Sequence, residues 1–330
     1  MELLSSMAGS LATPAVLFFV LGVIATAVRT DLRFPEPLYT GLTLYLLVAI
    51  GFKGGVAVAT AGLAEVWLPA LAAVALGAFI PLWTYPVLRY LGRLAPVDAA
   101  AIGAHYGSVS AVTFLAAVGF LQERGQPFEP YASALLAVME SPAIVMGVVL
   151  GRLAGGTGRI EPVALARLAL HEGLLGRSVF LLLGSMLVGF LSGERGMAAT
   201  AGFFVTPFQG VLALFLFEMG MVAARRFGDL RKVGPFLIGF GVIMPVLHGA
   251  VGTGLGAWCG LSEGGAMLLG VLAASASYIA APAAMRLSLP EANPTLYLTA
   301  ALAITFPFNI VFGLPLYAWM ARFWYPGGAS

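Results

Sequence analysis

The chain has 330 residues, of which 60% are hydrophobic and only 10% are charged. Soluble domains carry roughly a quarter of their residues as charged side chains, so this composition excludes a water-soluble domain and indicates a membrane protein. The 17 basic and 15 acidic residues exclude a nucleic-acid-binding domain. The single cysteine, Cys259, excludes an intrachain disulfide and a cysteine-cluster metal site.

Ten apolar segments follow one another along the chain, and each has the length expected of a membrane-spanning helix. They cover residues 11–28, 37–58, 67–91, 97–121, 131–151, 177–193, 203–224, 234–259, 262–288 and 294–322. Residues 1–12 contain Glu2 and no Lys or Arg, so the basic start of a cleavable signal peptide is missing. We therefore expect the first segment to be retained as a span.

Basic residues are concentrated in alternate connections between the segments. Thirteen of the 17 fall on one side: Arg29, Arg33, Arg89, Arg93, Arg152, Arg159, Arg167, Arg177, Arg225, Arg226, Arg231, Lys232 and Arg286. The opposite connections hold Arg124, Arg195 and Arg322. By the positive-inside rule, the side with thirteen faces the cytoplasm and both termini face out. The Leu, Ala and Arg pattern of the long connection at 152–176 fits either a short amphipathic surface helix or a solvated linker.

The two sides of this linker resemble each other at an offset of about 167 positions. Residues 41–51 align with 210–220, residues 108–118 with 275–285, and residues 131–142 with 297–307. Because each half has an odd number of spans, the second half must enter the membrane in the reverse orientation. We predict an all-α membrane protein of ten transmembrane helices, built as two inverted five-helix repeats at 1–151 and 177–330.

The fourth and ninth segments carry small and polar residues at matching positions. The fourth reads GSVSA at 107–111, and the ninth reads ASASY at 274–278, followed by Pro282. Such runs often mark tight helix packing, but their recurrence in both halves favours a discontinuous helix in each half. Interrupted helices expose amide N–H groups that suit an anion and carbonyl oxygens that suit a cation.

Five ionisable groups lie at membrane depth, where they are costly unless paired or hydrated: Lys53, His105, Glu140, Glu218 and His248. Glu140 precedes a proline and is the best candidate for a cation-binding carboxylate. Asn309 offers an amide oxygen beside a further break in the last segment. For a coupling sodium ion we select carboxylate, hydroxyl and amide oxygens, from Glu140, Ser110, Thr113, Ser277 and Asn309.

The other ionisable groups have structural interpretations beside the functional one. Glu218 lies within about two helical turns of Arg225, so an ion pair is expected at least as much as a functional role. His248 is interpreted as a hydrogen-bonded packing residue, and Lys53 as a side chain that snorkels from a helix end. His105 is more suggestive of function because it adjoins the first break.

Six stretches match one known family in order and spacing: GFKGGVAV (51–58), GSVSAVTFLAA (107–117), MESPAIV (139–145), EMGM to LRK (218–232), AASASYIAAP (273–282) and LPEANPTLYL (289–298). In these stretches the chain resembles the SbtA-type sodium-dependent bicarbonate transporters, a bacterial permease family. The best-known members carry an acidic residue where this chain has Tyr278, and they have a longer central linker.

The resemblance implies a ten-span protein of the bacterial inner membrane, usually a homotrimer, that imports bicarbonate with sodium and needs no other cofactor. Some relatives are inhibited by a PII-like cytoplasmic protein. In that family the anion lies between the two interrupted helices. Carried over, this predicts substrate contacts from Gly107, Ser108, Val109, Ser110 and Ala111 and from Ser275, Ala276, Ser277 and Tyr278.

The leading expectation is thus a secondary transporter that moves a small anion with a cation by alternating access, not an enzyme. The same fold could carry another small anion, such as a short carboxylate, with sodium or with protons acting through Glu140 or His105. A passive channel is a further alternative. An intramembrane serine hydrolase is a remote one, because GSVSA is not a convincing nucleophile motif and catalysis would not require the repeat.

Overall fold

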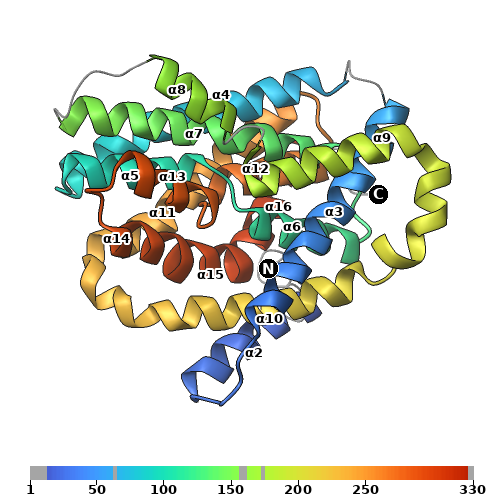
Figure 1. Cartoon of the computed structure of the whole chain (residues 1–330), viewed down its shortest axis with the longest axis horizontal. Coiled ribbons are helices and arrows are strands. Elements are labelled where there is room, and N and C mark those ends of the chain that lie inside the picture. The colour runs from blue at the N-terminus through green and yellow to red at the C-terminus, as the bar shows by residue number, and fades with distance from the viewer. Residues whose placement is uncertain (1–12, 62–64, 156–161, 172–174, 326–330) are drawn as a thin grey trace.

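A computed structural model of the chain describes residues 13–61, 65–155, 162–171 and 175–325. Every regular element in these residues is a helix, as Figure 1 shows, so the expected all-α class is confirmed. The expectation about a signal peptide concerns residues 1–12, which lie outside the described residues.

The first five expected segments are all helical in their described parts. Their helices are α2 (Pro14–Ala27), α3 (Glu36–Ala61), α4 (Trp67–Pro86) with the π-turn η2 (Val87–Leu91), α5 (Pro96–Gly107) followed by α6 (Ala111–Glu123), and α7 (Ala132–Gly155). A short helix, α8 (Pro162–Leu170), forms within the central connection. Of the two interpretations of this connection, the structure therefore favours the one with a helix.

The second half of the chain is helical as well. It contains α9 (Arg177–Phe204), α10 (Phe208–Arg226), the short 3₁₀ turn η4 (Phe227–Asp229), α11 (Leu230–Trp258), α12 (Glu263–Ala274) and α13 (Ala280–Ser288). The last expected segment is one run of helical turns, made of α14 (Pro294–Thr299), η5 (Ala300–Thr305), α15 (Phe306–Phe308), η6 (Asn309–Gly313) and α16 (Leu314–Phe323). Of these, η5 and η6 are π-helical.

Within the described residues, seven helical stretches are long and apolar enough to cross a membrane. They are Glu36–Thr60, Trp67–Leu91, Pro96–Glu123, Ala132–Ala154, Arg177–Phe204, Phe208–Trp258 and Pro294–Phe323. The expected count of ten is not reached by this criterion. The reason is that α2 and α12 are apolar but short, and that α10 and α11 form one 51-residue stretch through η4. The chain is an all-α membrane protein.

Two kinks fall where the sequence places the ends of apolar segments. Gly193 adopts φ 58° inside α9, at the expected end of the segment 177–193. Gly234 adopts φ 75° inside α11, at the expected start of the segment 234–259, and Pro235 follows it. Only glycine adopts this backbone conformation without strain, so these positions separate the apolar helices from their connections.

The helices pack in two groups (Figure 1). In the first group, α2 packs mainly on α10 and α3 mainly on α9, so each pair joins one helix of either half of the chain. In the second group, α4, α5 and α7 pack on one another, and α11 packs on α12, which contacts α16. The stretch Pro96–Glu123 is the most enclosed candidate span in the described residues, with 94% of its most apolar window buried.

Glycines allow the backbones of the first group to touch. A Cβ atom on Gly22 of α2 would overlap the carbonyl oxygen of Phe217 in α10, and one on Gly220 of α10 would overlap that of Phe19 in α2. The α3–α9 crossing has the same form, since a Cβ atom on Gly189 of α9 would overlap the carbonyl oxygen of Phe52. Small residues at such crossings are the usual device for close helix packing in membranes.

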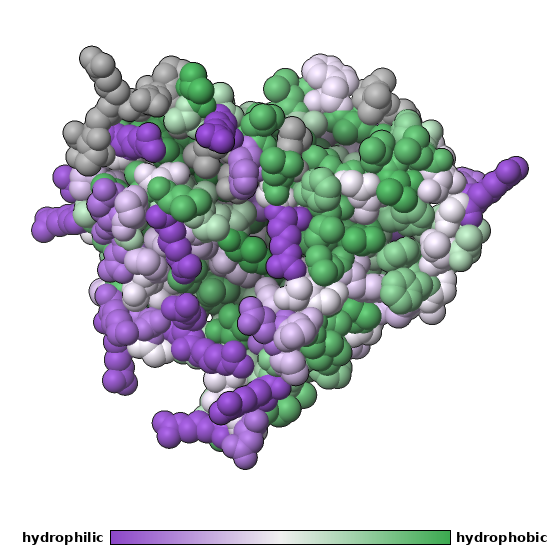
Figure 2. Space-filling model, in the orientation of Figure 1, coloured by the Kyte–Doolittle hydropathy of each residue, from purple (hydrophilic) through white to green (hydrophobic). Residues whose placement is uncertain are grey.

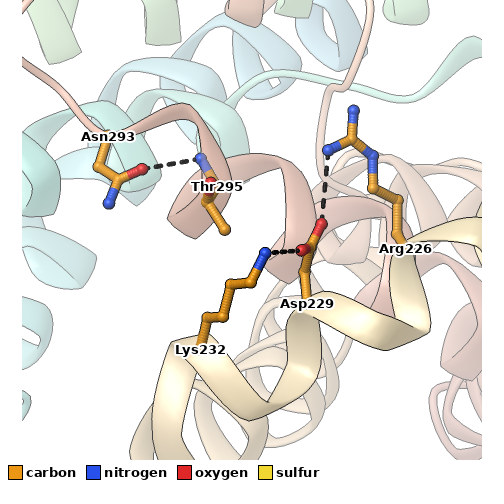
Figure 3. Close-up of polar contacts among 5 residues, drawn as sticks. All are labelled: Arg226, Asp229, Lys232, Asn293 and Thr295. Atoms are coloured by element: carbon orange, nitrogen blue, oxygen red, sulfur yellow. Dashed lines mark hydrogen bonds and ion pairs between the residues drawn. The ribbon is translucent and has the colours of Figure 1, made fainter.

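Connections expected on the basic face lie together at one end of the second group. The amide of Asn293 donates a 2.7 Å hydrogen bond to Asp98 Oδ1, which joins the starts of α14 and α5. Figure 3 shows the same region: Asn293 Oδ1 accepts from the Thr295 amide at 3.0 Å and caps α14. Nearby, Asp229 in the α10–α11 turn binds Lys232 at 2.7 Å and Arg226 at 3.6 Å. On the opposite expected face, Arg322 of α16 pairs with Glu263 of α12 at 3.3 Å.

Candidate functional site

Both expected interruptions are present. Between α5 and α6, residues 108–110 leave the helical conformation, with Ser108 at φ −82°, ψ 168° and Ser110 at φ −105°, ψ 108°. Between α12 and α13, residues 275–279 do the same, starting with Ser275 at φ −84°, ψ 164°. The first serine of each Ser-x-Ser therefore ends one half-helix in nearly the same extended conformation.

The two breaks lie against each other in the interior. The amide of Ser110 donates a 2.9 Å hydrogen bond to the hydroxyl oxygen of Ser275. The amide of Ser277 donates a 2.8 Å hydrogen bond to the carbonyl oxygen of His105. Since all these residues are buried, each break uses the other to satisfy backbone groups that its own helix has lost.

The second serine of each motif caps the half-helix that follows. Ser110 Oγ accepts hydrogen bonds from the Thr113 amide at 3.1 Å and from the Thr113 hydroxyl at 3.0 Å. Ser277 Oγ accepts from the Ala281 amide at 3.2 Å. Helices α6 and α13 therefore both begin at the breaks, where the positive ends of their dipoles lie.

A small cavity lies at these two N-termini. Its volume is about 10 Å³, which is room for about one water-sized group. The lining residues come from both breaks and from two neighbouring helices: Val109, Ser110, Ala111, Glu140, Ser178, Ser277, Tyr278 and Ile279. Of the sequence-predicted residues, Val109, Ser110, Ala111, Glu140, Ser277 and Tyr278 thus share one cavity.

Glu140 supplies the one carboxylate among the lining residues. It is 7% exposed and lies on α7, and its carbonyl oxygen accepts a 3.2 Å hydrogen bond from the Ser108 hydroxyl. The first break is thus tied to the helix that carries the acid. A carboxylate, two serine hydroxyls and two helix N-termini combine, at one point, groups for a hard cation and groups for an anion.

Other predicted residues lie behind the cavity. Ser108, Ser275 and Ala276 are buried and do not line it. Gly107 faces α4 and α7, where a Cβ atom would stand 2.6 Å from Pro81 Cδ and 2.9 Å from Ala143 Cβ. The absence of a side chain at Gly107 thus allows α4 and α7 to pack closely against the end of α5.

Asn309 has a different position from the one expected. Its Nδ2 donates a 2.9 Å hydrogen bond to the carbonyl oxygen of Ala274, the last residue of α12, and its Oδ1 accepts a 2.7 Å bond from the Tyr317 hydroxyl. It does not line the cavity. Asn309 therefore caps the half-helix that precedes the second break.

Tyr278 brings a polar group without a partner to the cavity. Its hydroxyl oxygen is buried and has no hydrogen-bond partner among the described residues. The ring packs edge-on against Phe306 at 5.5 Å between centroids, which fixes its orientation. Burying a hydroxyl without a partner is costly, so this group is available to a bound ligand.

Sequence reasoning missed Ser178. This residue lies in the first turn of α9 and reaches the cavity from the other helix group. In the sequence, Ser178 is a serine next to Arg177 at the start of an apolar segment. Such a position is also typical of an ordinary helix end, so it did not indicate a binding site.

The imidazole rings of the two buried histidines contact groups other than serine side chains. His105 Nδ1 lies 2.6 Å from the Ala101 carbonyl oxygen and its ring stacks on Tyr297 at 4.3 Å between centroids, while its Nε2 has no partner in the described residues. Trp83 Nε1 donates a 2.9 Å hydrogen bond to His248 Nε2, which confirms His248 as a hydrogen-bonded packing residue.

The remaining ionisable candidates lie outside the cavity. Glu218 is 3.9 Å from Arg225, which confirms the expected ion pair. Lys53 differs from its interpretation: it lies well inside α3, half-buried, with its ammonium group 5.2 Å from the centre of the Phe208 ring. It is thus held by an aromatic face rather than reaching water from a helix end.

Comparison with known proteins adds one finding. A family model described as the Na+-dependent bicarbonate transporter superfamily matches residues 14–322, which is nearly the whole chain and includes both breaks. No curated protein matches it.

Proposed function

The chain belongs to the Na+-dependent bicarbonate transporter superfamily, and we propose on this basis that it imports bicarbonate together with sodium across the bacterial inner membrane. Membership supports a transporter, and it argues against the hydrolase alternative. The bonded ring nitrogens of His105 and His248 face Ala101 and Trp83, and no hydrogen bond of the described residues joins either imidazole ring to a serine side chain.

One observation carries the proposal: two interrupted helices meet in the protein interior and direct both half-helix N-termini at a cavity that also contains Glu140. The N-terminal amides and the hydroxyls of Ser277 and Tyr278 are suited to a small oxyanion. The Glu140 carboxylate and the Ser110 hydroxyl line the cavity and are suited to sodium, and the Thr113 hydroxyl supports Ser110 through a 3.0 Å hydrogen bond. Placing the two ions together lowers the cost of each in a low-dielectric site, and it requires the cavity to widen beyond its volume of about 10 Å³ during the transport cycle.

Coupling has an energetic reason. An anion that enters a negative cytoplasm works against about 2.3 kcal/mol per charge per 100 mV, and a co-transported sodium ion offsets this charge and adds its own gradient. In this proposal Asn309 acts indirectly, because it holds the Ala274 carbonyl at the cavity end of α12.

We further propose that the chain has ten spans arranged as two inverted repeats, with both termini outside. Support comes from the α2–α10 and α3–α9 crossings, where Gly22 corresponds to Gly189 and Gly51 to Gly220 at nearly the offset of the aligned segments. The two groups of helices are suitable moving parts for alternating access, because Ser178 of one faces the breaks of the other. The homotrimer and the PII-like regulator remain expectations from the family resemblance.

One observation favours a second candidate, in which protons replace sodium. His105 adjoins the first break, and its Nε2 is buried without a partner in the described residues, so it offers a site for a proton next to the Ser277 amide contact. A proton-coupled carrier would respond to a pH gradient in the absence of sodium.

The test is uptake of labelled bicarbonate by proteoliposomes at alkaline pH, where inorganic carbon is mostly bicarbonate, with and without an inward sodium gradient. We expect accumulation only with sodium, and loss of most uptake in Ser110→Ala and Ser277→Ala. Ser192→Ala is the matched control, since Ser192 is exposed and bonds only its own helix at Val188. Uptake equal to empty vesicles under both gradients would refute the proposal, and uptake driven by pH alone would favour the second candidate.

A further inference from the structure

A second polar cavity lies far along the chain from the breaks, between the α2–α3 turn and the end of α10. Its volume is about 720 Å³, and it is lined by Thr30, Asp31, Leu32, Arg33, Phe34 and Arg225. These residues belong to connections that the positive-inside rule places on the cytoplasmic side. In Figure 2, hydrophilic residues gather at the lower tip of the molecule, where Figure 1 places the turn after α2.

The two arginines of this cavity have little carboxylate compensation. No carboxylate of the described residues lies within 4 Å of Arg33, and the carboxylate that pairs with Arg225 is that of Glu218, at 3.9 Å. Asp31 also lines the cavity, so with Glu218 at Arg225 the guanidinium group of Arg33 is the one in this cavity that has no described carboxylate within 4 Å. Of the neighbouring basic residues, Arg226 is already paired with Asp229. The cavity therefore presents the unpaired guanidinium group of Arg33 beside that of Arg225, whose ion pair with Glu218 is long at 3.9 Å, and an anionic oxygen group would satisfy both.

An apolar stripe leads along α2 to this cavity. Leu17, Leu21, Ile24 and Val28 follow the spacing of one helix face and are 53%, 50%, 49% and 65% exposed. Leu32, which is 55% exposed, continues the stripe into the lining of the cavity itself. The surface thus has an apolar strip at membrane depth that ends in a cationic pocket at the membrane boundary.

We propose that this surface binds one phospholipid with an anionic headgroup. The phosphate lies between Arg33 and Arg225, and an acyl chain lies along the α2 stripe. A free anion would use only the arginines, whereas a lipid also places an acyl chain against the apolar side of α2, which as an expected span already borders the bilayer. The bound lipid would bridge the α2–α3 turn and the end of α10, and so stabilise the α2–α10 pair.

The experiment is thermal unfolding of the purified protein in detergent, with phosphatidylglycerol, phosphatidylcholine or inorganic phosphate added separately. Phosphatidylglycerol is expected to raise the unfolding temperature, and the other two are not. Arg33→Gln is expected to weaken this effect so that about tenfold more phosphatidylglycerol is needed for the same shift. Arg286→Gln, which removes an exposed charge elsewhere on the same expected face, is the control and should keep the shift.

Two further measurements distinguish binding of a lipid from binding of a free anion. Native mass spectrometry should show one phosphatidylglycerol retained by the wild type and lost in both Arg33→Gln and Arg225→Gln. Leu32→Ala should weaken lipid retention without changing the charge of the cavity. Equal shifts with all three additives, a full shift with inorganic phosphate alone, or an unchanged shift in Arg33→Gln would overturn the proposal. None of these measurements depends on which ion is transported.

Discussion

Trp83 of α4 and His248 of α11 are joined by a 2.9 Å hydrogen bond between the indole Nε1 and the imidazole Nε2. The bond connects the first and second halves of the chain within the group of helices that contains both breaks. His248 is buried, and its Nδ1 has no partner among the described residues. Among the described residues, the Trp83 indole is thus the one side chain that forms a hydrogen bond with the His248 imidazole.

Trp83→Phe should lower the free energy of unfolding by about 1–3 kcal/mol, because it leaves a buried imidazole nitrogen without a donor. The measurement is thermal or denaturant unfolding in detergent. Trp67→Phe is the control, since Trp67 is 62% exposed at the start of the same helix. An unchanged midpoint for Trp83→Phe would show that the bond does not contribute to stability.

Two glycines of α10 should respond in opposite ways to alanine. Gly220→Ala places a methyl group into the backbone of α2 at Phe19 and should cost about 1–3 kcal/mol of stability. Gly210→Ala has open space around it and should be neutral or slightly stabilising, because alanine favours the helix. Unfolding midpoints of the two variants test this, and similar values for both would contradict the close α2–α10 contact.

Asn309→Asp separates a supporting role from direct sodium binding. Aspartate keeps an oxygen that could bind sodium but loses the N–H that binds the Ala274 carbonyl, so we expect transport to fall sharply. Tyr317→Phe, which removes only the bond to Asn309 Oδ1, should reduce transport less. If Asn309→Asp instead retains transport and has a lower half-saturating sodium concentration, residue 309 is a direct sodium ligand.

Tyr278→Phe should weaken anion binding and leave stability nearly unchanged. Its hydroxyl lies beside Ser110 without a well-formed hydrogen bond, so its removal costs little internally, while a bound oxyanion would lose one donor. A roughly two- to tenfold rise in the half-saturating anion concentration is expected. Tyr90→Phe, at a 71% exposed position, is the control. Unaltered half-saturation would remove the Tyr278 hydroxyl from the binding site.

The sequence predicted the helical segments and both interruptions because these depend on local properties: apolar runs, glycine, proline and paired serines. The kinks inside α9 and α11 at Gly193 and Gly234 follow from the same local signals. The number of spans is harder to predict, since α2 and α12 are short and a single 3₁₀ turn joins α10 to α11.

The site was predicted less completely, because its residues meet through packing between distant helices. Ser178 reaches the cavity from a helix of the other group, which no local pattern indicates. Asn309 was assigned to the sodium set because a break was expected beside it, yet the chain is helical throughout this region. Its amide group instead bonds Ala274 and Tyr317, and the contact to Ala274 spans 35 positions, which no local pattern indicates.

The contact between Ser110 and Ser275 spans 165 positions of sequence, and this distance has a consequence for biogenesis. The ribosome completes the first interrupted segment long before its partner exists, so the Ser110 amide enters the translocon without a protein acceptor. The contact can therefore form only after translation has passed Ser275, and a nascent chain that stops earlier lacks the acceptor for the Ser110 amide.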